Sequence, residues 1–240
     1  MNKKDFEKKL NGYLKKIDIW LNEEQVDKFY KYMELLIEWN EKMNLTAIIE
    51  PDDIILKHFV DSLTIEKYIK KEAELIDVGT GAGFPGIPLK IYRKDIEIVL
   101  LDSLNKRIIF LDEVIKYLEL DKIKTIHSRA EDIGMDEGYR EKFDIATSRA
   151  VANLSTLSEY LIPLVDVGGK IVSMKGPIVE EEVECAKKAI SVLGGEIEKT
   201  DVFDLPNTDM KRTNIVIKKV KNTPVKYPRK SGIPTKEPIQ

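Results

Sequence analysis

The stretch Glu74-Leu-Ile-Asp-Val-Gly-Thr-Gly-Ala-Gly-Phe-Pro-Gly-Ile-Pro-Leu89 decides the fold, because it is typical of a buried strand that runs directly into a glycine-rich loop. Its first part is a short apolar run interrupted only by Asp77, as in the central strand of a parallel sheet. Four glycines follow at close spacing: Gly79, Gly81, Gly83 and Gly86. Glycine lets the backbone turn tightly and approach a bound molecule closely, so the stretch predicts a cofactor-binding loop.

Two kinds of cofactor are compatible with this loop. Residues 81–86 match the dinucleotide pattern G-x-G-x-x-G, with Asp102 about 20 residues further on as a ribose acceptor. A carboxylate at Asp77 would raise the energy of a dinucleotide pyrophosphate by like-charge repulsion. S-adenosylmethionine carries an ammonium and a sulfonium and no phosphate, so it suits an acidic residue before the glycines. The sequence therefore favours S-adenosylmethionine, and a glycine-rich turn without a ligand is the structural alternative.

Composition limits the class of protein. The chain has 240 residues with 42% hydrophobic content, enough for one large domain or one domain with a small appendage. No apolar run approaches the ~18 residues of a membrane span, and the charged N-terminus lacks an apolar signal core. We expect a cytoplasmic protein with no membrane contact. A single cysteine, Cys185, excludes an internal disulfide, and with only His58 and His127 beside it no metal site is expected.

Charge is distributed unevenly along the chain. The net charge is −3, but residues 211–240 contain nine lysines and arginines against one acid, Glu237, a net charge of +8. The preceding 210 residues therefore carry −11. Such asymmetry indicates a basic contact arm for a polyanion, and a solubilising disordered tail is the alternative.

Helical patterns occupy the N-terminal part. Residues 1–20 have the spacing of a short amphipathic helix, and a second helix starts with Asn22 as its N-cap and Gln25 at the capping-box position. Pro51 starts a further helix that carries His58 on its apolar face. We expect His58 to be a packed, hydrogen-bonded side chain rather than a ligand.

Strands and helices alternate from residue 74 onward. Strands are predicted at 74–78, 96–101, 123–127, 143–147 and 169–174, and helices at 86–93, 105–119, 154–165 and 179–193. This alternation is typical of a parallel doubly wound sheet. Two more strands, 196–204 and 212–220, have no helix between them, so they should form an antiparallel hairpin at the sheet edge. The proline-rich and lysine-rich tail after residue 220 should be extended rather than helical.

These patterns predict an α/β protein with a Rossmann-like doubly wound sheet, a C-terminal antiparallel hairpin and an N-terminal helical extension. The expected divisions are a helical extension packed on the core at 1–70, a cofactor-binding domain at 71–220 and a basic tail at 221–240.

The residues directly after each predicted strand lie where an open parallel sheet binds its ligand. They are Gly79 to Phe84, Asp102 and Ser103, Arg129 to Glu131, Ser148 to Ala150, and Lys175 to Pro177. Three further motifs accompany them: Trp39-Asn-x-x-x-Asn44-Leu-Thr46, His58-Phe-x-Asp61-Ser62 and Asp102-Ser-x-x-Lys106-Arg107-x-x-Phe110-Leu. In combination they closely resemble the RsmG (GidB) family of bacterial 16S rRNA guanine-N7 methyltransferases, from about residue 20 to residue 230.

The resemblance implies a class I methyltransferase fold and methyl transfer from S-adenosyl-L-methionine to N7 of a guanosine in the 530 loop of 16S rRNA. The implied partner is 16S rRNA or a precursor of the small ribosomal subunit. The implied cofactor-binding residues are Asp77, Gly79, Gly81, Gly83, Phe84, Asp102, Ser103, Ala130, Glu131 and Arg149.

Within that set the resemblance implies distinct roles. Gly79 and Phe84 would line the methionine side of the cofactor, Asp102 would accept from the ribose hydroxyls, and Ala130 with Glu131 would frame the adenine. Arg149 would lie beside the cofactor carboxylate or the incoming RNA. A helix N-cap is the alternative role for Asp102, and a salt bridge at the end of its strand is the alternative for Arg149.

Cations near the cofactor edge and in the tail are candidates for RNA binding, with solvated surface positions as the alternative. They are Lys106, Arg107, Lys175, Lys226, Arg229 and Lys230.

No catalytic residue is predicted. Guanine N7 is an unprotonated nucleophile at neutral pH, so its methylation needs proximity and alignment more than a general base. Cys185 lies in the middle of a predicted helix, where we expect it to pack rather than act as a nucleophile. A small-molecule methyltransferase and a non-catalytic sensor of S-adenosylmethionine or a nucleotide are the competing functions.

Overall fold

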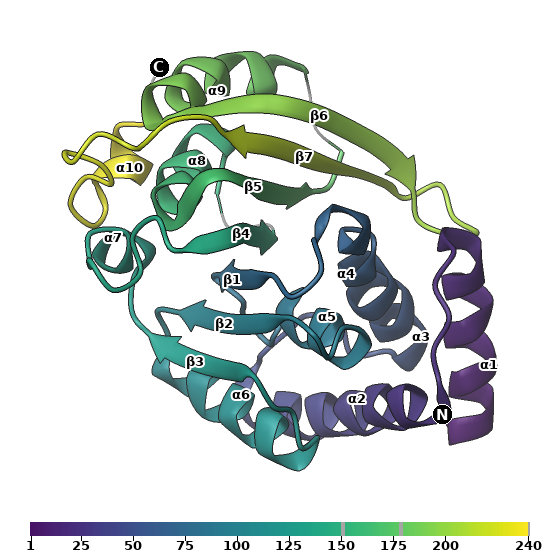
Figure 1. Cartoon of the computed structure of the whole chain (residues 1–240). Helices are drawn as coiled ribbons and strands as arrows, with labels where there is room; N and C mark the ends of the chain where they lie inside the picture. The colour runs from purple at the N-terminus through teal and green to yellow at the C-terminus, as the bar shows by residue number, and fades with distance from the viewer. Residues whose placement is uncertain (150–151, 178–179, 240) are drawn as a thin grey trace.

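The computed structural model describes residues 1–149, 152–177 and 180–239, which build one seven-stranded sheet with helices on both faces (Figure 1). The strands are β1 Glu74–Val78, β2 Glu97–Asp102, β3 Ile123–His127, β4 Phe143–Arg149, β5 Val165–Lys175, β6 Gly195–Asp204 and β7 Lys211–Lys219. Their order across the sheet is β3-β2-β1-β4-β5-β7-β6. β1 to β5 are parallel, and β7 runs antiparallel to both β5 and β6, so the predicted doubly wound sheet with its terminal hairpin is confirmed.

β1 lies in the middle of this sheet because both of its faces are apolar. Successive side chains of a strand point to opposite faces, and Leu75 packs into one hydrophobic core while Ile76 and Val78 pack into the other. All three are almost completely buried. The strand therefore delivers the glycine loop from the centre of the molecule to its edge.

The helices divide between the two faces of the sheet. One core contains side chains of α1 Lys3–Leu14, α2 Glu23–Met43, α5 Gly86–Tyr92 and α6 Asn105–Tyr117. The other contains side chains of α7 Ala130–Ile133, α8 Leu154–Leu161 and α9 Glu180–Leu193. In Figure 1 the purple and blue helices of the N-terminal half lie together, away from the green helices α8 and α9.

The N-terminal helices form as the sequence predicts. Asn22 caps α2: its side chain accepts from the N–H of Gln25 at 2.9 Å, and the Gln25 side chain accepts from the N–H of Asn22 at 2.9 Å. The helix that starts at Pro51 comprises α3 Pro51–Asp53, a π-helical segment Ile54–Val60 and α4 Asp61–Leu63. Such widened turns often occur at functional sites, and this one contains His58.

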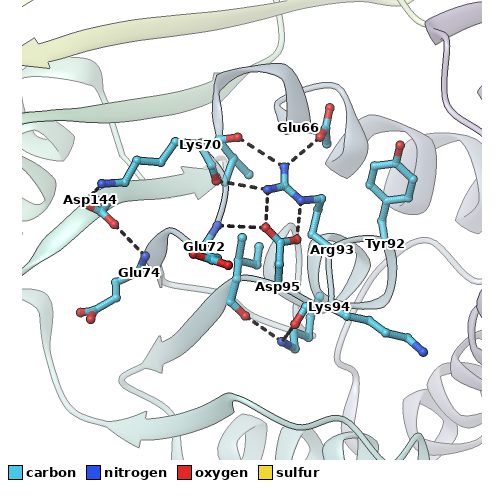
Figure 2. A network of polar contacts seen from close by, with 12 residues as sticks. Glu66, Lys70, Glu72, Glu74, Tyr92, Arg93, Lys94, Asp95 and Asp144 are labelled. Atoms are coloured by element: carbon cyan, nitrogen blue, oxygen red, sulfur yellow. Dashed lines mark hydrogen bonds and ion pairs between the residues drawn. The ribbon is translucent and has the colours of Figure 1, made fainter.

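A polar network joins the end of the N-terminal extension to the sheet (Figure 2). Arg93 donates to Glu66 at 2.9 Å and to both carboxylate oxygens of Asp95 at 2.7 Å. Hydrogen bonds from Arg93 hold the pKa of the Asp95 carboxyl well below its usual range. Lys70 pairs with Asp144, the second residue of β4, at 2.6 Å. These contacts fix the extension to the start of β1 and β4.

Several boundaries differ from the predictions. The helix predicted at 154–165 ends at Leu161 and continues as a 3-10 turn, Ile162–Leu164, since a proline at its second position prevents a regular helix. β5 then begins at Val165, four residues earlier than predicted. The predicted start of the helix at residue 179 lies outside the described residues, as do Ala150 and the last residue of the tail.

The tail departs most from its prediction. It contains a short helix, α10 Ile233–Lys236. The expectation of a wholly extended tail is therefore wrong at α10.

The prediction that Cys185 packs in its helix is also wrong. Cys185 is exposed on α9, because the buried stripe of that helix runs through Ala186, Ala189 and Ile190 instead.

Candidate functional site

Asp77 lies beneath the glycine loop rather than at its surface. It is completely buried, and its Oδ2 accepts from the N–H of Gly86 at 2.9 Å and from the hydroxyl of Thr80 at 2.6 Å. Burial raises the pKa of Asp77 to about 6. Its Oδ1 has no hydrogen-bond partner within the described residues. The structure corrects the expectation that this carboxylate faces the ligand, because the side chain is buried and its Oδ2 accepts hydrogen bonds from the loop itself.

Two glycines of the loop are required by their geometry. Gly81 has φ +63° and its N–H donates to Asp102 at 2.9 Å, while no atom lies within 4 Å of a Cβ built there. At Gly83, with φ +99°, a Cβ would lie 2.7 Å from the hydroxyl oxygen of Tyr32. The loop is therefore open on the side of Gly81 and pressed against helix α2 at Gly83.

Helix α2 holds the loop through Tyr32. The buried Tyr32 hydroxyl donates to the carbonyl of Ala82, and its ring packs against Phe59 and Phe84 with centroids 5.4 and 5.5 Å apart. Burial raises the pKa of this hydroxyl well above its usual range, so it remains a donor. The N-terminal extension thus forms part of the site.

Two cavities open beside the loop and share Gly79, Asp102 and Ser103. The larger, of about 430 Å³, is lined by Leu45, Thr46, His58, Gly79, Thr80, Gly81, Ala82, Phe84, Asp102, Ser103, Arg107 and Arg149. The smaller, of about 230 Å³, is lined by Val78, Gly79, Leu101, Asp102, Ser103, Ser128, Arg129, Ala130, Glu131, Tyr160, Gly232 and Thr235. Together they form one cleft across the carboxyl ends of β1, β2 and β3, where open α/β sheets bind ligands.

Asp102 stands at the junction of the two cavities. Its Oδ2 accepts from the N–H of Gly81 and, at 3.2 Å, from Arg107, while its Oδ1 accepts from the N–H of Leu104 at 2.9 Å. It closes the turn before α6, but the N-cap position belongs to Leu104, so the N-cap alternative for Asp102 is wrong. Ser103 lines both cavities beside it.

Arg149 connects the end of β4 to the π-helical segment. Its Nη1 donates to the carbonyl of Lys57 at 2.9 Å and to Asp61 at 3.3 Å, and its Nη2 donates to Nδ1 of His58 at 3.0 Å. The guanidinium lies 5.0 Å from the ring centre of Phe84, on which His58 also stacks at 4.2 Å. The salt bridge at the end of the strand is confirmed. Arg149 also lines the cleft, and its role beside a cofactor carboxylate or RNA stays a prediction.

The hydrogen bonds fix the form of His58. An arginine guanidinium has no acceptor, so Nδ1 of His58 must accept and the ring carries its proton on Nε2. Nε2 then donates to Oγ1 of Thr46 at 3.0 Å. Burial lowers the pKa of His58 to about 3, with Arg149 adding to the effect, so the ring is neutral at neutral pH. Oγ1 of Thr46 also accepts from the N–H of Ile48 at 3.1 Å. The hydroxyl proton of Thr46 therefore remains available as a donor, and the residue lines the larger cavity.

A third cavity, of about 370 Å³, adjoins the cleft and shares His58 and Arg149 with it. Its wall includes Lys57, Asp61, Met174, Lys175, Gly176 and Arg212. Asp61 is buried, its pKa is raised by burial, and it receives Arg149 and Arg212 at 3.3 Å each. Lys57 and Lys175 pair with Asp53 and Glu182, which do not line the cavity, so the lining itself presents more cationic donors than carboxylates and suits a hydrogen-bond-accepting group.

Glu131 and Ala130 lie at the far end of the smaller cavity, as expected for residues after β3. Glu131 is almost buried, and its Oε1 accepts from the N–H of Gly232 at 3.0 Å. The tail therefore reaches the site directly.

The cations predicted to bind RNA divide into two groups. Lys226 and Lys230 are exposed and take no part in an ion pair within the described chain, and exposed Lys106 donates to the carbonyl of Met43 at 3.2 Å. By contrast, Arg107 is paired with Asp102, Lys175 with Glu182 at 2.7 Å, and Arg229 with Glu159 at 2.7 Å.

The contacts of Arg229 contradict the prediction that this residue binds RNA as part of a basic arm. Its partner Glu159 is completely buried, so the charge of Arg229 is neutralised inside the protein rather than presented to a phosphate. Lys219, counted in the same +8 segment, is also completely buried and pairs with Glu141 at 3.1 Å. The number of available cations in the segment is therefore smaller than its composition indicates.

Some site residues were not predicted individually. Tyr32, Tyr160, Gly232, Thr235 and Arg212 belong to the site or its support through tertiary contacts. No local pattern marks them. Thr46 and Asp61 stand in the quoted motifs, which were the available signal, and His58 was expected to be only a packed side chain, whereas it also lines the cleft.

Across residues 1–149, 152–177 and 180–239, no three side chains of His, Cys, Asp or Glu come together as metal ligands would. Among the helices within these ranges, none is long and apolar enough to cross a membrane.

Comparisons with known proteins agree with this geometry. The family described as GidB, rRNA small subunit methyltransferase G, matches residues 25–211. A protein from Clostridium novyi named ribosomal RNA small subunit methyltransferase G is 50% identical over 232 residues, covering 96% of each chain. A protein of the same name from Acetivibrio thermocellus is 57% identical over 220 residues, covering 91% of this chain and 90% of the other.

Solved structures share the fold at much lower identity. A putative transferase from Pyrococcus horikoshii has a TM-score of 0.55 at 14% identity, over 66% of this chain and 62% of the other. The M. jannaschii protein TYW2, solved in complex with AdoMet, has a TM-score of 0.54 at 16% identity, over 66% of this chain and 74% of the other. These likenesses establish the Rossmann-like fold of the sheet.

Proposed function

The chain belongs to the rRNA small subunit methyltransferase G (GidB) family, and we propose on that premise that it transfers a methyl group from S-adenosyl-L-methionine to N7 of a guanosine in the 530 loop of 16S rRNA. The observation that carries this proposal is the cleft around the glycine loop, next to a cation-lined cavity that shares His58 and Arg149 with it.

The cleft fits S-adenosylmethionine in size and polarity. Asp102 at the junction would accept from the ribose hydroxyls, which places the adenine in the smaller cavity beside Ala130 and Glu131. The methionine part would lie in the larger cavity beside Gly79 and Phe84, where Arg149 is a partner for its carboxylate. When bound there, S-adenosylmethionine supplies an electrophilic methyl group on a sulfonium.

The third cavity suits the target nucleotide. It shares His58 and Arg149 with the larger cavity, and Lys57, Lys175 and Arg212 line it. A nucleotide whose base enters past His58 and Arg149 would keep its phosphates near these cations. Each of these cations also has a carboxylate partner within the protein, since Lys57 pairs with Asp53, Lys175 with Glu182 and Arg212 with Asp61.

Methylation at guanine N7 requires no general base, and His58 does not supply one. Nδ1 of His58 accepts from Arg149 and its Nε2–H donates to Thr46, so neither ring nitrogen is free to take a proton. Guanine N7 attacks through an available lone pair, and the chain contributes by orienting the base and excluding water. An N7 target is thus consistent with the residues around the cleft.

The cellular test is mapping of N7-methylguanosine in small-subunit rRNA from cells with and without this protein. We expect one modified position in the 530 loop to disappear when the protein is absent. An unchanged modification map, together with methylation of a metabolite by the purified protein, would favour the small-molecule alternative. Cofactor binding with no turnover on either substrate would favour the sensor.

A binding test locates the cofactor. Calorimetry should show S-adenosylmethionine binding by the parent and a loss of affinity of about tenfold or more in Asp102→Ala and Gly79→Val, since the first removes the ribose acceptor and the second fills the loop. Equal affinity in folded variants would contradict the assigned cleft. Tighter binding of NAD than of S-adenosylmethionine would revive the dinucleotide alternative.

The partner of the proposed reaction is an rRNA of the small subunit, and its form and the cellular location of the protein are part of the proposal. The substrate is either naked 16S rRNA or a precursor of the small subunit, which comparison of methylation rates on the two would decide. A cytoplasmic location follows from such a substrate and would be checked by cell fractionation.

A further inference from the structure

The C-terminal tail, residues 221–239, is built into the fold beside the cofactor cleft. Figure 1 shows its yellow ribbon and α10 next to α7 and α8. Gly232 and Thr235 of the tail line the smaller cavity, and Gly232 contacts Glu131 there. A segment predicted to grip RNA therefore lines the proposed adenine pocket.

A buried ion pair anchors the tail. Arg229 donates from Nε and Nη2 to the Glu159 carboxylate at 3.0 and 2.7 Å, and its backbone N–H donates to the same group at 2.7 Å. Its Nη2 also donates to the carbonyl of Glu237 at 2.8 Å, which ties the far side of α10 to the same point. Because Glu159 is completely buried, loss of its partner would leave an uncompensated buried charge.

Arg140 supplies a second anchor. Its guanidinium donates to the carbonyls of Thr223 and Tyr227 at 2.7 Å each, and to the carbonyl of Gly134 at 2.8 Å. Pro228 lies so near Gly134 that a Cβ built there would be 2.7 Å from the proline ring. The segment before the cavity is thus held from both sides.

Weaker contacts join the tail to the cavity itself. The N–H of Gly232 donates to Glu131 at 3.0 Å, Thr235 shares a hydrogen bond of 2.9 Å with the hydroxyl of Tyr160, and Thr156 donates to the carbonyl of Pro234 at 3.0 Å. The bonds of Thr235 and Thr156 join neutral groups, whereas the bond from Gly232 to the Glu131 carboxylate is charge-assisted and stronger. All three bonds lie between the points that Arg229 holds, its own position and the carbonyl of Glu237, so residues 231–236 can open locally while both arginine anchors stay closed.

We propose that the tail segment 231–239 is a cofactor-binding element, a wall that closes on the adenine end of S-adenosylmethionine and is itself ordered by it. The proposal rests on the proposed function, because it takes the adenine into the smaller cavity. A ligand that binds only the closed form of this wall must reduce its opening by the same free energy that the wall adds to binding.

The first experiment measures hydrogen exchange in the full chain. Saturating S-adenosylmethionine should slow exchange of the Gly232 amide by several-fold or more, since that N–H is exposed only when the wall opens. The amide of Lys218 on β7, remote from the cavity, serves to report any change in global stability. An unchanged Gly232 exchange rate in the presence of bound cofactor overturns the proposal.

The second experiment fills the cavity from the tail. Thr235→Trp should lower the affinity for S-adenosylmethionine by about tenfold or more in calorimetry, because the added ring occupies the proposed adenine space. Val225→Trp is the matched control, since Val225 is an exposed tail residue outside the proposed wall and does not line the cavity, and this variant should bind as the parent does. Parent affinity in both variants overturns the proposal.

The outcomes distinguish the tail from the cleft. If Asp102→Ala loses affinity while Thr235→Trp binds normally, the cleft assignment stands and the tail proposal falls. If the parent binds no S-adenosylmethionine, the proposed function fails and the tail proposal with it.

Discussion

At the residue scale, Asp77 shows how burial changes the role of a conspicuous side chain. The sequence places a carboxylate before the glycines, and a cationic ligand is an obvious partner for it. In the folded protein its acceptor oxygen serves Gly86 and Thr80, and no part of the residue is exposed. Asp77 therefore acts on the ligand through the shape of the loop.

The raised pKa of Asp77 predicts a pH-dependent cost. The pKa is about 6 in the folded protein against an ordinary value of 3.8, so its contribution to stability is complete below about pH 4 and is lost as the pH rises through 6. Asparagine has no carboxyl group to ionise, so Asp77→Asn does not lose stability in this way as the pH rises. Between pH 4 and pH 7 the free energy of unfolding of Asp77→Asn should therefore rise relative to the parent by roughly 3 kcal/mol, measured by urea denaturation without cofactor.

Asp95→Asn is the control for this prediction. Hydrogen bonds from Arg93 lower the pKa of Asp95, so the contribution of Asp95 to stability is present above about pH 4 and is lost only as the pH falls below it. The difference between Asp95→Asn and the parent should therefore change little between pH 4 and pH 7. A difference between Asp77→Asn and the parent that stays constant from pH 4 to pH 7 would show that Asp77 is ionised normally.

His58 supplies the second prediction at this scale. Its depressed pKa of about 3 means that its contribution to stability is present above about pH 6.5 and is lost as the pH falls toward 3. Nitrogen-15 NMR should find a neutral ring with its proton on Nε2 down to about pH 5. Arg149→Met should remove the donor to Nδ1 and release this tautomer preference. A parent ring that gains a proton between about pH 6 and pH 7 would contradict the network.

At the scale of elements, α2 and the glycine loop form one unit although 50 residues separate Tyr32 from Ala82 in the chain. The loop has few side chains of its own to hold it, so its conformation depends on what packs against it. The Tyr32 hydroxyl and the close approach at Gly83 supply that restraint.

This dependence is tested by Tyr32→Phe. The variant leaves the ring packing in place but deprives the Ala82 carbonyl of its donor, at a cost of about 1–3 kcal/mol. We expect a lower free energy of unfolding and a several-fold loss of S-adenosylmethionine affinity by calorimetry. The matched control on the same helix is Tyr30→Phe, whose hydroxyl donates to the carbonyl of Met1 at 3.1 Å far from the loop. Equal cofactor affinity in both variants would show that α2 does not support the loop.

At the scale of the whole molecule, the distribution of available charge differs from the distribution in the sequence. Three cations of the +8 segment, Arg212, Lys219 and Arg229, are paired with internal carboxylates. Its exposed lysines include Lys218, Lys221, Lys226, Lys230 and Lys236. RNA binding at this surface should therefore depend on the exposed lysines, among them the predicted contacts Lys226 and Lys230.

The prediction concerns salt dependence. Lys226→Ala with Lys230→Ala should weaken RNA binding regardless of sequence and flatten the slope of log affinity against log salt by about 0.7–0.9 per lost contact. Cofactor affinity should stay at the parent value. Lys8→Ala with Lys16→Ala, a pair of exposed lysines in the N-terminal segment, is the charge-matched control. An equal slope in both double variants would direct the search for the RNA surface to Lys57 and Arg212.

The sequence by itself determined the sheet and the position of the cleft. Local patterns suffice there: apolar runs such as Leu75–Val78 make strands, alternation with helices makes them parallel, and parallel strands bring Gly79, Asp102 and Glu131 to one edge. The motif resemblance added the family, which the comparisons confirm.

Only the tertiary structure decided what each charged and aromatic side chain does there. Asp77 and Arg229 changed roles because burial makes an unpaired charge costly. The fold returns the N–H of Gly86 to Asp77 within the glycine stretch, and it brings Glu159 to Arg229 from 70 residues away. Tyr32 and Thr235 reached the site from opposite ends of the chain. Such contacts follow from packing between remote segments, and no local periodicity encodes them.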